Sequence, residues 1–425
     1  MLNENEKRLC AAVDEARLVR TCQELVRIPS VNPYSGDKNP SGEAACLAHV
    51  EKLCRELGGE VMRVPCDDKL CEAHGIGFPR GRANAGRESV LAKFVFGSGR
   101  GPVFALDAHI DTVAVDNYRG EPFSGELREG FIYGRGSSDD KSGATVMLET
   151  IRVLKDHPEG LEGTLYLCFV TEEECDGSGR GSIACIAAMP KPDGAIVLDG
   201  NYGAVRPGSS GILTARVEVP GKSGHAAYGA VSAIAQALKL QPAFEAFKAA
   251  RPDEPGMLNW GVFRAGDHPA NVPDKAELGL NLRTLAADAD EAFARYGKRS
   301  GRTVRERFES CIAEVAAQDP FMKEHPPRVV WIKDLPGEVD DAWAGDFIAL
   351  MRDAWTDATG ETPEVAPMCG WGDITHFIRA GIPSVGMGAS WPGMAHATEE
   401  KVRVADLLHT TQAVVAAAAR FLRRQ

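Results

Sequence analysis

The sequence has no excess of positive charge and no block of basic residues. Its 60 Asp and Glu outnumber its 48 Lys and Arg, which gives a formal net charge of −12 at pH 7. Nucleic acids and anionic membranes attract proteins through clustered Lys and Arg. We therefore expect neither a nucleic-acid partner nor a membrane partner.

Long apolar runs are also lacking. The first 20 residues are charged throughout and have no apolar core of the kind found in secretory signals. The longest late apolar run, 413–419, stops at Arg420 and is far shorter than the roughly 20 residues that cross a bilayer. These features predict a soluble, cytoplasmic protein.

Cysteine is present in an odd number and without paired knuckle motifs. The 11 cysteines are scattered through stretches with helix or strand patterns. Cys66 and Cys71 form the closest pair, and nothing nearby completes a zinc site. We expect reduced, mostly buried thiols and no disulfide framework.

The length and the spacing of apolar residues predict the fold class. A chain of 425 residues exceeds the usual size of one hydrophobic core, which favours two domains. Short apolar runs at 102–106, 164–170, 195–198 and 382–387 are typical of buried parallel strands, and helical patterns separate them. The sequence thus predicts an α/β domain with a mainly parallel sheet. The Gly- and Arg-rich stretch 75–87 predicts a surface loop.

The pattern changes after Gly208. The order β-α-β-β-α-β there is typical of a small ferredoxin-like α+β sandwich. We expect residues 1–208 and 335–425 to form the catalytic domain, and 209–334 to form an inserted lid and dimerisation domain. The predicted strands are 211–219, 258–265, 275–285 and either 308–317 or 328–333, and the predicted helices are 231–250 and 288–306.

Acidic and histidine side chains follow the predicted parallel strands, at the ends where ligands bind in open α/β sheets. They are Asp107, His109 and Asp111 after the first run, Glu172, Glu173 and Glu174 after the second, Asp199 after the third and His396 after the fourth, with Asp139 and Asp140 in a Gly-rich turn. Carboxylates that converge on one rim repel each other unless cations are present. Two histidines with four or more carboxylates suit two divalent ions that share a bridging ligand.

Taken singly, these features have simpler explanations. An acidic triplet is usually a solvated surface, but this one directly follows the apolar run 165–170, which would point it into the crevice. A lone histidine is more often structural or exposed, and we interpret seven of the histidines in that way. They are His49, His74, His157, His268, His325, His376 and His409.

Five segments together resemble those of the acetylornithine deacetylase, succinyl-diaminopimelate desuccinylase, aminoacylase and glutamate carboxypeptidase family. The segments follow the family's order across nearly the whole chain. They are LDAHIDT at 106–112, GRGSSDDK at 134–141, VTEEECDG at 170–177, GKSGH at 221–225 and AHATEE at 395–400.

The resemblance implies a role for each matched residue. His109 and Asp199 would bind one metal ion, Glu174 and His396 would bind a second, Asp139 would bridge both, Glu173 would be the general base, and Asp111 would orient His109. Zn²⁺ is the first choice, with Mn²⁺ and Co²⁺ left open. The chain departs from the pattern at two positions, because many relatives have Glu where Asp199 stands and Gly where Ser142 stands. The resemblance also implies a cis peptide bond between Asp139 and Asp140.

Three further roles fall on the inserted domain. By resemblance, His225 would reach the scissile carbonyl across a homodimer, and Asn271 and Arg283 would bind a substrate carboxylate. An Arg fork is the natural partner of that group. Whether His225 acts in its own subunit or in the neighbouring one stays open.

The function implied is metal-dependent hydrolysis of an amide bond in a small substrate with a free carboxylate, by an N-acyl amino acid deacylase or a di- or exopeptidase. The sequence does not distinguish these substrates. Two alternatives are a catalytically degenerate relative that acts as a binding dimer and a two-metal phosphatase. No ligand is missing, as it would be in the first, and the dedicated phosphate cradle of the second is lacking.

Overall fold

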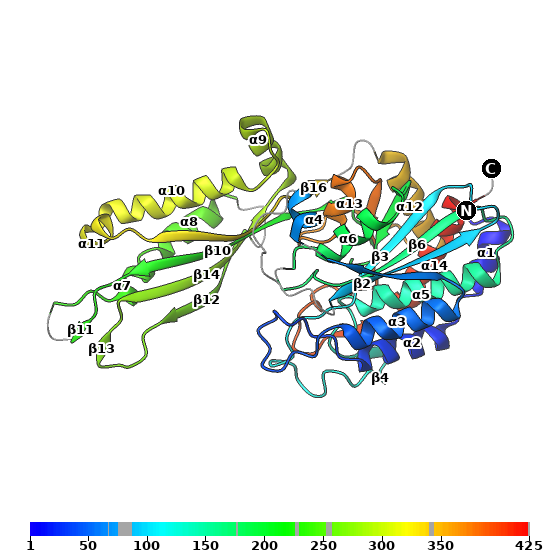
Figure 1. Ribbon diagram of the computed structural model, residues 1–425, viewed down its shortest axis with the longest axis horizontal. Coiled ribbons are helices and arrows are strands. Elements are labelled where there is room, and N and C mark those ends of the chain that lie inside the picture. The colour runs from blue at the N-terminus through cyan, green and yellow to red at the C-terminus, as the bar shows by residue number, and fades with distance from the viewer. Residues whose placement is uncertain are drawn as a thin grey trace.

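The computed structural model describes residues 1–66, 68–74, 87–175, 177–225, 229–251, 257–339 and 344–423. Two separate sheets organise the chain, a six-stranded one in the larger part of the molecule and a four-stranded one beside it (Figure 1). Except for Arg87, the predicted loop 75–87 lies outside the described residues. No helix in the described part of the chain is long and apolar enough to cross a membrane. All 11 cysteines are free thiols, as expected.

The six-stranded sheet is mixed and mostly parallel. Its strand order is β1-β2-β6-β3-β7-β18. The four predicted runs form the parallel strands, which are β3 (Val103–His109), β6 (Gly163–Val170), β7 (Gly194–Val197) and β18 (Ser384–Gly386). Two strands that the sequence analysis did not single out, β1 (Glu60–Pro65) and β2 (Glu88–Phe96), pair antiparallel at one edge.

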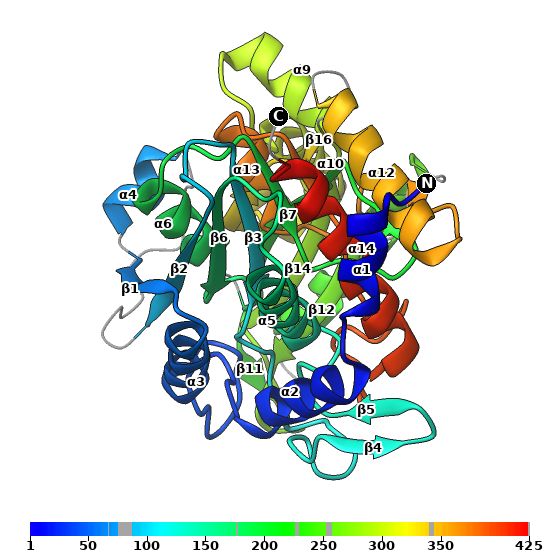
Figure 2. The ribbon, with the colours of Figure 1, turned by 90° about the vertical axis from the view of Figure 1, so that its right-hand side faces the viewer.

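Helices cover both faces of this sheet (Figure 2). One layer consists of α2 (Glu15–Arg27), α3 (Ala44–Glu56), α5 (Lys141–Asp156), α12 (Gly345–Thr359) and α14 (Val404–Phe421), with α1 (Glu4–Ala11) packed on α14. The other layer consists of α4 (Asp68–Ala73), α6 (Arg180–Ala188) and α13 (Ile374–Arg379). Successive strand residues such as Leu167 and Cys168 join opposite layers, so both faces are buried. This burial explains the uninterrupted apolar runs.

A small sheet brings two distant turns together. Strands β5 (Phe131–Tyr133) and β19 (Lys401–Arg403) pair, with β4 (Glu126–Arg128) on the outside. Tyr133 lies opposite Lys401. The Gly-rich turn that follows Tyr133 therefore lies beside the loop that precedes Lys401. A second small pair, β8 (Ala204–Val205) with β17 (Glu364–Val365), lies near the edge strand β18.

The four-stranded sheet is antiparallel throughout, in the order β12-β14-β10-β15. Its strands are β10 (Gly211–Pro220), β12 (Leu258–Ala265), β14 (Lys275–Thr284) and β15 (Arg328–Leu335). Helices α7 (Ala233–Leu238), α8 (Gln241–Ala249) and α10 (Arg302–Gln318) pack on one face. The short strands β11 (Gly224–His225) and β13 (Asn271–Val272) pair at the end farthest from the larger part (Figure 1). The predicted order of elements is confirmed.

Two predicted helices were wrong in extent, and the structure decides between the two positions predicted for the fourth strand. The helix expected at 231–250 is two helices, because α7 ends at Leu238 and Pro242 lies in the first turn of α8, where its missing N–H is tolerated. The helix expected at 288–306 is also two, since α9 (Ala286–Tyr296) ends at the left-handed Gly297. The stretch 308–317 is part of α10 and not a strand, so the fourth strand is β15. The short helix α11 (Pro320–Glu324) follows α10.

Two connections join the two parts. Strands β9 (Gly208–Ser209) and β16 (Glu338–Val339) carry them and pair antiparallel. A Cβ atom at Gly208 would lie 2.1 Å from the carbonyl oxygen of Glu338, so only glycine fits this close approach. The predicted domain boundaries fall beside this pair of strands and stay a prediction.

Candidate metal centre

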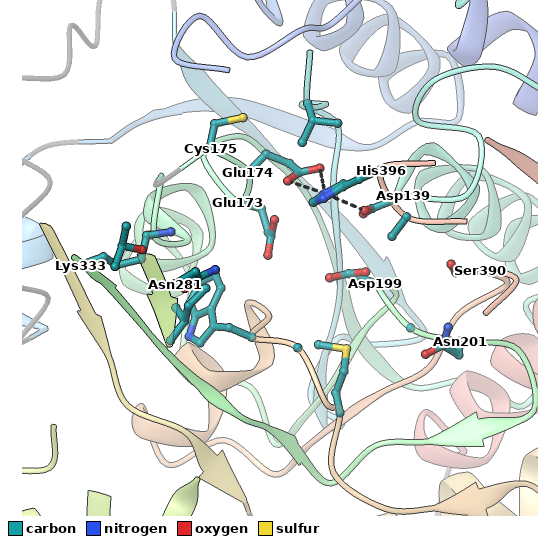
Figure 3. A pocket seen from close by; sticks show the side chains of 18 residues that line it. Asp139, Glu173, Glu174, Cys175, Asp199, Asn201, Asn281, Lys333, Ser390 and His396 are labelled. Atoms are coloured by element: carbon teal, nitrogen blue, oxygen red, sulfur yellow. Dashed lines mark hydrogen bonds and ion pairs between the residues drawn. The ribbon is translucent and has the colours of Figure 1, made fainter. Parts of the chain in front are cut away.

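The five predicted metal ligands form two groups that share one carboxylate. His109, Asp139 and Asp199 form the first group, and Asp139, Glu174 and His396 form the second. Within each group one ligand atom per residue lies within 4.8 Å of the others. Nε2 of His109 is 2.9 Å from Oδ1 of Asp139. Nε2 of His396 is 3.1 Å from each Glu174 oxygen and 3.5 Å from Oδ2 of Asp139 (Figure 3). The shared position of Asp139 is the one that the resemblance implies.

The topology explains why these residues meet. Strands β6, β3 and β7 are parallel neighbours, so their carboxyl ends lie at one edge. His109 ends β3, and Glu174 and Asp199 follow β6 and β7 within a few residues. Asp139 lies in the turn before α5, and the Asp139–Asp140 peptide bond is cis, as predicted. His396 has a positive φ of 61° in the loop before β19.

The electrostatics of the cluster fit bound cations. Burial and neighbouring carboxylates raise the pKa of Asp199 to about 7, and burial raises the pKa of Glu173 well above its ordinary value. The hydrogen bond to Glu174 raises the pKa of His396 to about 9. These upward pKa shifts show that the carboxylates favour bound positive charge, either as protons or as cations. Two imidazoles and three carboxylates are a donor set that suits two divalent ions of the zinc, manganese or cobalt kind.

Asp111 contacts His109 in a different way from the one expected. Nδ1 of His109 is 3.0 Å from the backbone carbonyl oxygen of Asp111 and 3.7 Å from its carboxylate. The carboxylate accepts hydrogen bonds from the side chain of Asn32 at 2.8 Å and from the backbone N–H of Glu174 at 3.3 Å. Asp111 therefore ties the strand end that carries His109 to the loop that carries Glu174. Its predicted role in orienting His109 stays a prediction.

Sequence reasoning missed Glu400, which holds the Gly-rich turn. Its fully buried carboxylate accepts hydrogen bonds from the backbone N–H groups of Gly136, Ser138 and Asp139 at 2.9–3.0 Å. It also pairs with the buried guanidinium of Arg135 at 2.8 Å. Glu400 follows His396 by four residues, so it joins the loop of one candidate ligand to the turn of another. The only signal in the sequence was its place in a matched segment.

A second missed cluster supports the loop after Glu174. The hydroxyl of Ser182 lies 3.1 Å from the Asp107 carboxylate and 2.6 Å from that of Asp373. His376, predicted to be structural, is buried, and its Nε2 lies 2.8 Å from the carbonyl oxygen of Ser178. Burial lowers the pKa of His376 to about 3. The ring is therefore neutral, and its N–H donates to that carbonyl.

A cavity of about 540 Å³ opens onto the two groups. Glu173 also lines this cavity. Within the described part of the chain, it belongs to neither of the two ligand groups. The four-stranded sheet closes one side of the cavity with residues from β10, β14 and β15, while Asn201 and Ser390 lie on another side (Figure 3). The side chains that line the cavity from the four-stranded sheet are Ile212, Thr214, Asn281 and Lys333.

The three residues predicted on the inserted domain do not line this cavity. His225 is exposed and lies opposite Asn271 in the β11–β13 pair, at the far tip of the molecule (Figure 1). Arg283 donates a hydrogen bond from Nε to the hydroxyl of Ser210 at 2.8 Å. Arg283 lines a neighbouring pocket of about 370 Å³ together with Asn259 and Trp371. A single chain therefore brings neither His225 nor Asn271 to the metal centre.

The fold and the paired acidic and histidine groups define a metallohydrolase. Residues 105–420 match the model of peptidase family M20/M25/M40, and the chain belongs to this family. A dinuclear metal-binding peptidase of the M20 family from Bacillus subtilis shares the fold, with a TM-score of 0.61 and 16% identity over 96% of this chain and 98% of that one. The chain is thus a member of a family of dinuclear metal peptidases and amidohydrolases.

Sequence identity to individual relatives is low. A succinyl-diaminopimelate desuccinylase of Caulobacter vibrioides is 25% identical over 92% of both chains. An N-formyl-4-amino-5-aminomethyl-2-methylpyrimidine deformylase of Halalkalibacterium halodurans is 26% identical over 73% of this chain and 77% of the relative. A tripeptidase of Staphylococcus aureus has a TM-score of 0.69 and 20% identity over 97% of this chain and all of that one, which shows a shared fold.

Proposed function

We propose that this protein hydrolyses an amide bond in a small substrate that carries a free carboxylate. Two divalent ions would be held by His109 and Asp199 on one side, by Glu174 and His396 on the other, and by Asp139 between them. The observation that carries the proposal is the pair of ligand groups that share Asp139 and open into one cavity beside Glu173.

Glu173, which lies outside both ligand groups, is the general base of the proposed reaction. When bound, the two ions would lower the pKa of an attacking water and offset the negative charge that develops on the scissile carbonyl oxygen. Glu173 takes the proton of that water and passes it to the leaving amine. Desolvation raises the pKa of its carboxyl well above the ordinary value, which makes the carboxylate a better proton acceptor.

The substrate class rests on the relatives and on the cavity. The named relatives remove a formyl or a succinyl group from an amine, and the structural neighbours include a tripeptidase. These proteins share cleavage of an amide bond to a small amine, and we propose an N-acyl amino acid or a short peptide as the form of that substrate here. The binding-dimer alternative is disfavoured because all five candidate ligands are present and grouped.

Several finer features belong to the same proposal. Zn²⁺ is the proposed ion, because imidazole and carboxylate both suit it, and Mn²⁺ and Co²⁺ are alternatives. The four-stranded sheet would act as a lid and as the contact of a homodimer. In such a dimer His225 and Asn271 of one subunit would complete the site of the other. A cytoplasmic location is part of the same proposal.

Metal removal tests the proposal. Prolonged chelation should abolish hydrolysis of N-acyl amino acids and dipeptides, and zinc, cobalt or manganese should restore it. Phosphate esters, assayed with the same metals, serve as the control for the phosphatase alternative. Full amide hydrolysis in a sample shown to be metal-free by elemental analysis would contradict the proposal, as would turnover of the esters alone.

A further inference from the structure

A row of four polar side chains crosses the four-stranded sheet. Asn259 lies directly opposite Asn281, Asn281 opposite Thr214, and Thr214 opposite Lys333. Residues directly opposite on antiparallel strands point to the same face, with Cβ atoms about 4.5–5.5 Å apart. The row therefore contains one residue of every strand and extends over about 15 Å.

The row lies on the face that the helices leave open. Along β10 and β14, buried residues alternate with more exposed ones, and the buried ones, such as Leu213 and Leu282, join the core under the helices. Thr214 and Asn281 alternate with these residues and point away from the helices. The open face at this row is the wall of the catalytic cavity.

Two pockets meet along the row. Thr214, Asn281 and Lys333 line the cavity of the metal centre, whereas Asn259 and Asn281 line the neighbouring pocket that contains Arg283. Figure 3 shows Lys333 and Asn281 on one side of the cavity, with Asp199 and His396 beyond Glu173. A ligand at the metal centre would therefore face Thr214, Asn281 and Lys333, whereas Asn259 belongs to the second pocket.

The charge of the row complements the charge of the metal centre. The larger part of the molecule presents four carboxylates to the cavity, from Asp139, Glu173, Glu174 and Asp199. Among the described residues that line the cavity, Lys333 is the one Lys or Arg. Lys333 is only 6% exposed, so its charge acts in a medium of low dielectric constant.

We infer that this row is the substrate-recognition site of the proposed amidohydrolase. Lys333 binds a carboxylate of the substrate, and the side chains of Asn281 and Thr214, beside Lys333 on the same wall, hydrogen-bond polar groups of the substrate. The inference rests on the proposed function and narrows it. The substrate is an extended amide whose carboxylate faces the four-stranded sheet, and Ile212, Met368 and Trp371 contact its uncharged part.

Matched substrates with and without the charge test the inference. The panel consists of N-acetylmethionine, N-acetylalanine and alanylglycine, each assayed on the zinc-loaded enzyme beside the carboxamide that lacks its single carboxylate. We expect the wild-type enzyme to prefer the carboxylate in kcat/KM, and Lys333→Met to reduce this preference by about tenfold to hundredfold, which corresponds to about 1.4–2.8 kcal/mol. Hydrolysis of the carboxamide should change by less than about threefold, because it has no charge for Lys333 to bind.

Two variants control for damage to the fold. Lys333→Arg keeps the charge and should restore most of the preference. Arg216→Met removes a cation from the same face of β10, outside the catalytic cavity, and should leave the preference unchanged. Melting temperatures confirm that the variants are folded.

The outcomes separate this inference from the proposed function. An unchanged carboxylate preference in Lys333→Met would overturn the inference and leave amide hydrolysis standing. Loss of the preference in Arg283→Met alone would assign the carboxylate to the neighbouring pocket and also overturn it. If no amide of a broader panel of N-acyl amino acids and dipeptides were hydrolysed after metal loading, the proposed function would fall, and the inference with it.

Discussion

The replacement Glu400→Gln tests whether Glu400 holds the turn that carries Asp139, the candidate bridging ligand. The carboxylate is fully buried and accepts four hydrogen bonds, three from backbone N–H groups and one from Arg135. Glutamine has nearly the same size but no charge, and its NH₂ group would face donors instead of accepting from them. The guanidinium of Arg135, itself 1% exposed, would lose its anionic partner.

The expected magnitude follows from these contacts. Burial raises the pKa of Glu400 to about 7, so the ion pair is complete only above that pH. At pH 8, removing one partner of a buried ion pair costs about 3–5 kcal/mol, because the remaining charge is left buried without compensation. One of the displaced donors is the backbone N–H of Asp139, so metal affinity should also fall, by about 10–100-fold as for other residues that support metal ligands.

The neighbouring residue provides a matched control. Glu399 has the same side chain but is exposed, so Glu399→Gln should change the free energy of unfolding by less than about 0.5 kcal/mol. Both variants would be unfolded in urea after metal removal, and zinc binding would be titrated on the folded proteins. If Glu400→Gln were within about 0.5 kcal/mol of Glu399→Gln, and bound zinc as tightly, the proposed support of Asp139 would be wrong.

Three further predictions concern catalysis, assembly and pH. Glu173→Ala should keep both metal ions and lose most turnover, whereas Glu174→Ala should also lose an ion; the reverse pattern in elemental analysis would move the base by one residue. Mixing inactive His225→Ala with inactive Glu173→Ala should restore up to about a quarter of wild-type activity if His225 completes the partner's site, and no recovery after confirmed subunit exchange would exclude this. Because the pKa of His376 is lowered to about 3, the unfolded chain takes up a proton below about pH 6.5 while the folded protein does not, so this histidine should cost stability as the pH falls. The stability advantage of wild type over His376→Gln should therefore shrink by about 1.4 kcal/mol per pH unit between pH 6 and 4, and parallel stability curves would show that His376 is not the group involved.

The sequence predicted the parallel strands, and it placed candidate ligands at strand ends that the structure brings together, for a physical reason. Strands such as β6 are buried on both faces, which gives uninterrupted apolar runs, and the residues at their ends are acidic or histidine. The parallel arrangement then brings His109, Glu174 and Asp199 to one edge. The edge strand β1 was missed because Val64 is the one buried residue of its six, so its apolar pattern is weak.

Other features could not be read from one chain's pattern. The break between α7 and α8 occurs where Pro242 lies in the first turn of α8. The sequence offers two positions for the fourth strand because Phe308 and Ile312 are also apolar. The contacts of Glu400 and Lys333 could not be read from their neighbours in the sequence, since both residues contact residues far away along the chain. The distance of His225 from the metal centre could not be predicted either, because β11, which carries it, lies at the far tip of the molecule (Figure 1).

The order of the candidate ligands along the chain has a consequence for biosynthesis. His109, Asp139 and Asp199 all precede the four-stranded sheet in sequence, whereas His396 follows it. A ribosome would finish the first group before it makes any residue of that sheet, and the second group only after the whole sheet has emerged. Under the proposed ligand set, the nascent chain could take up its first ion while the position for the second still lacks its histidine.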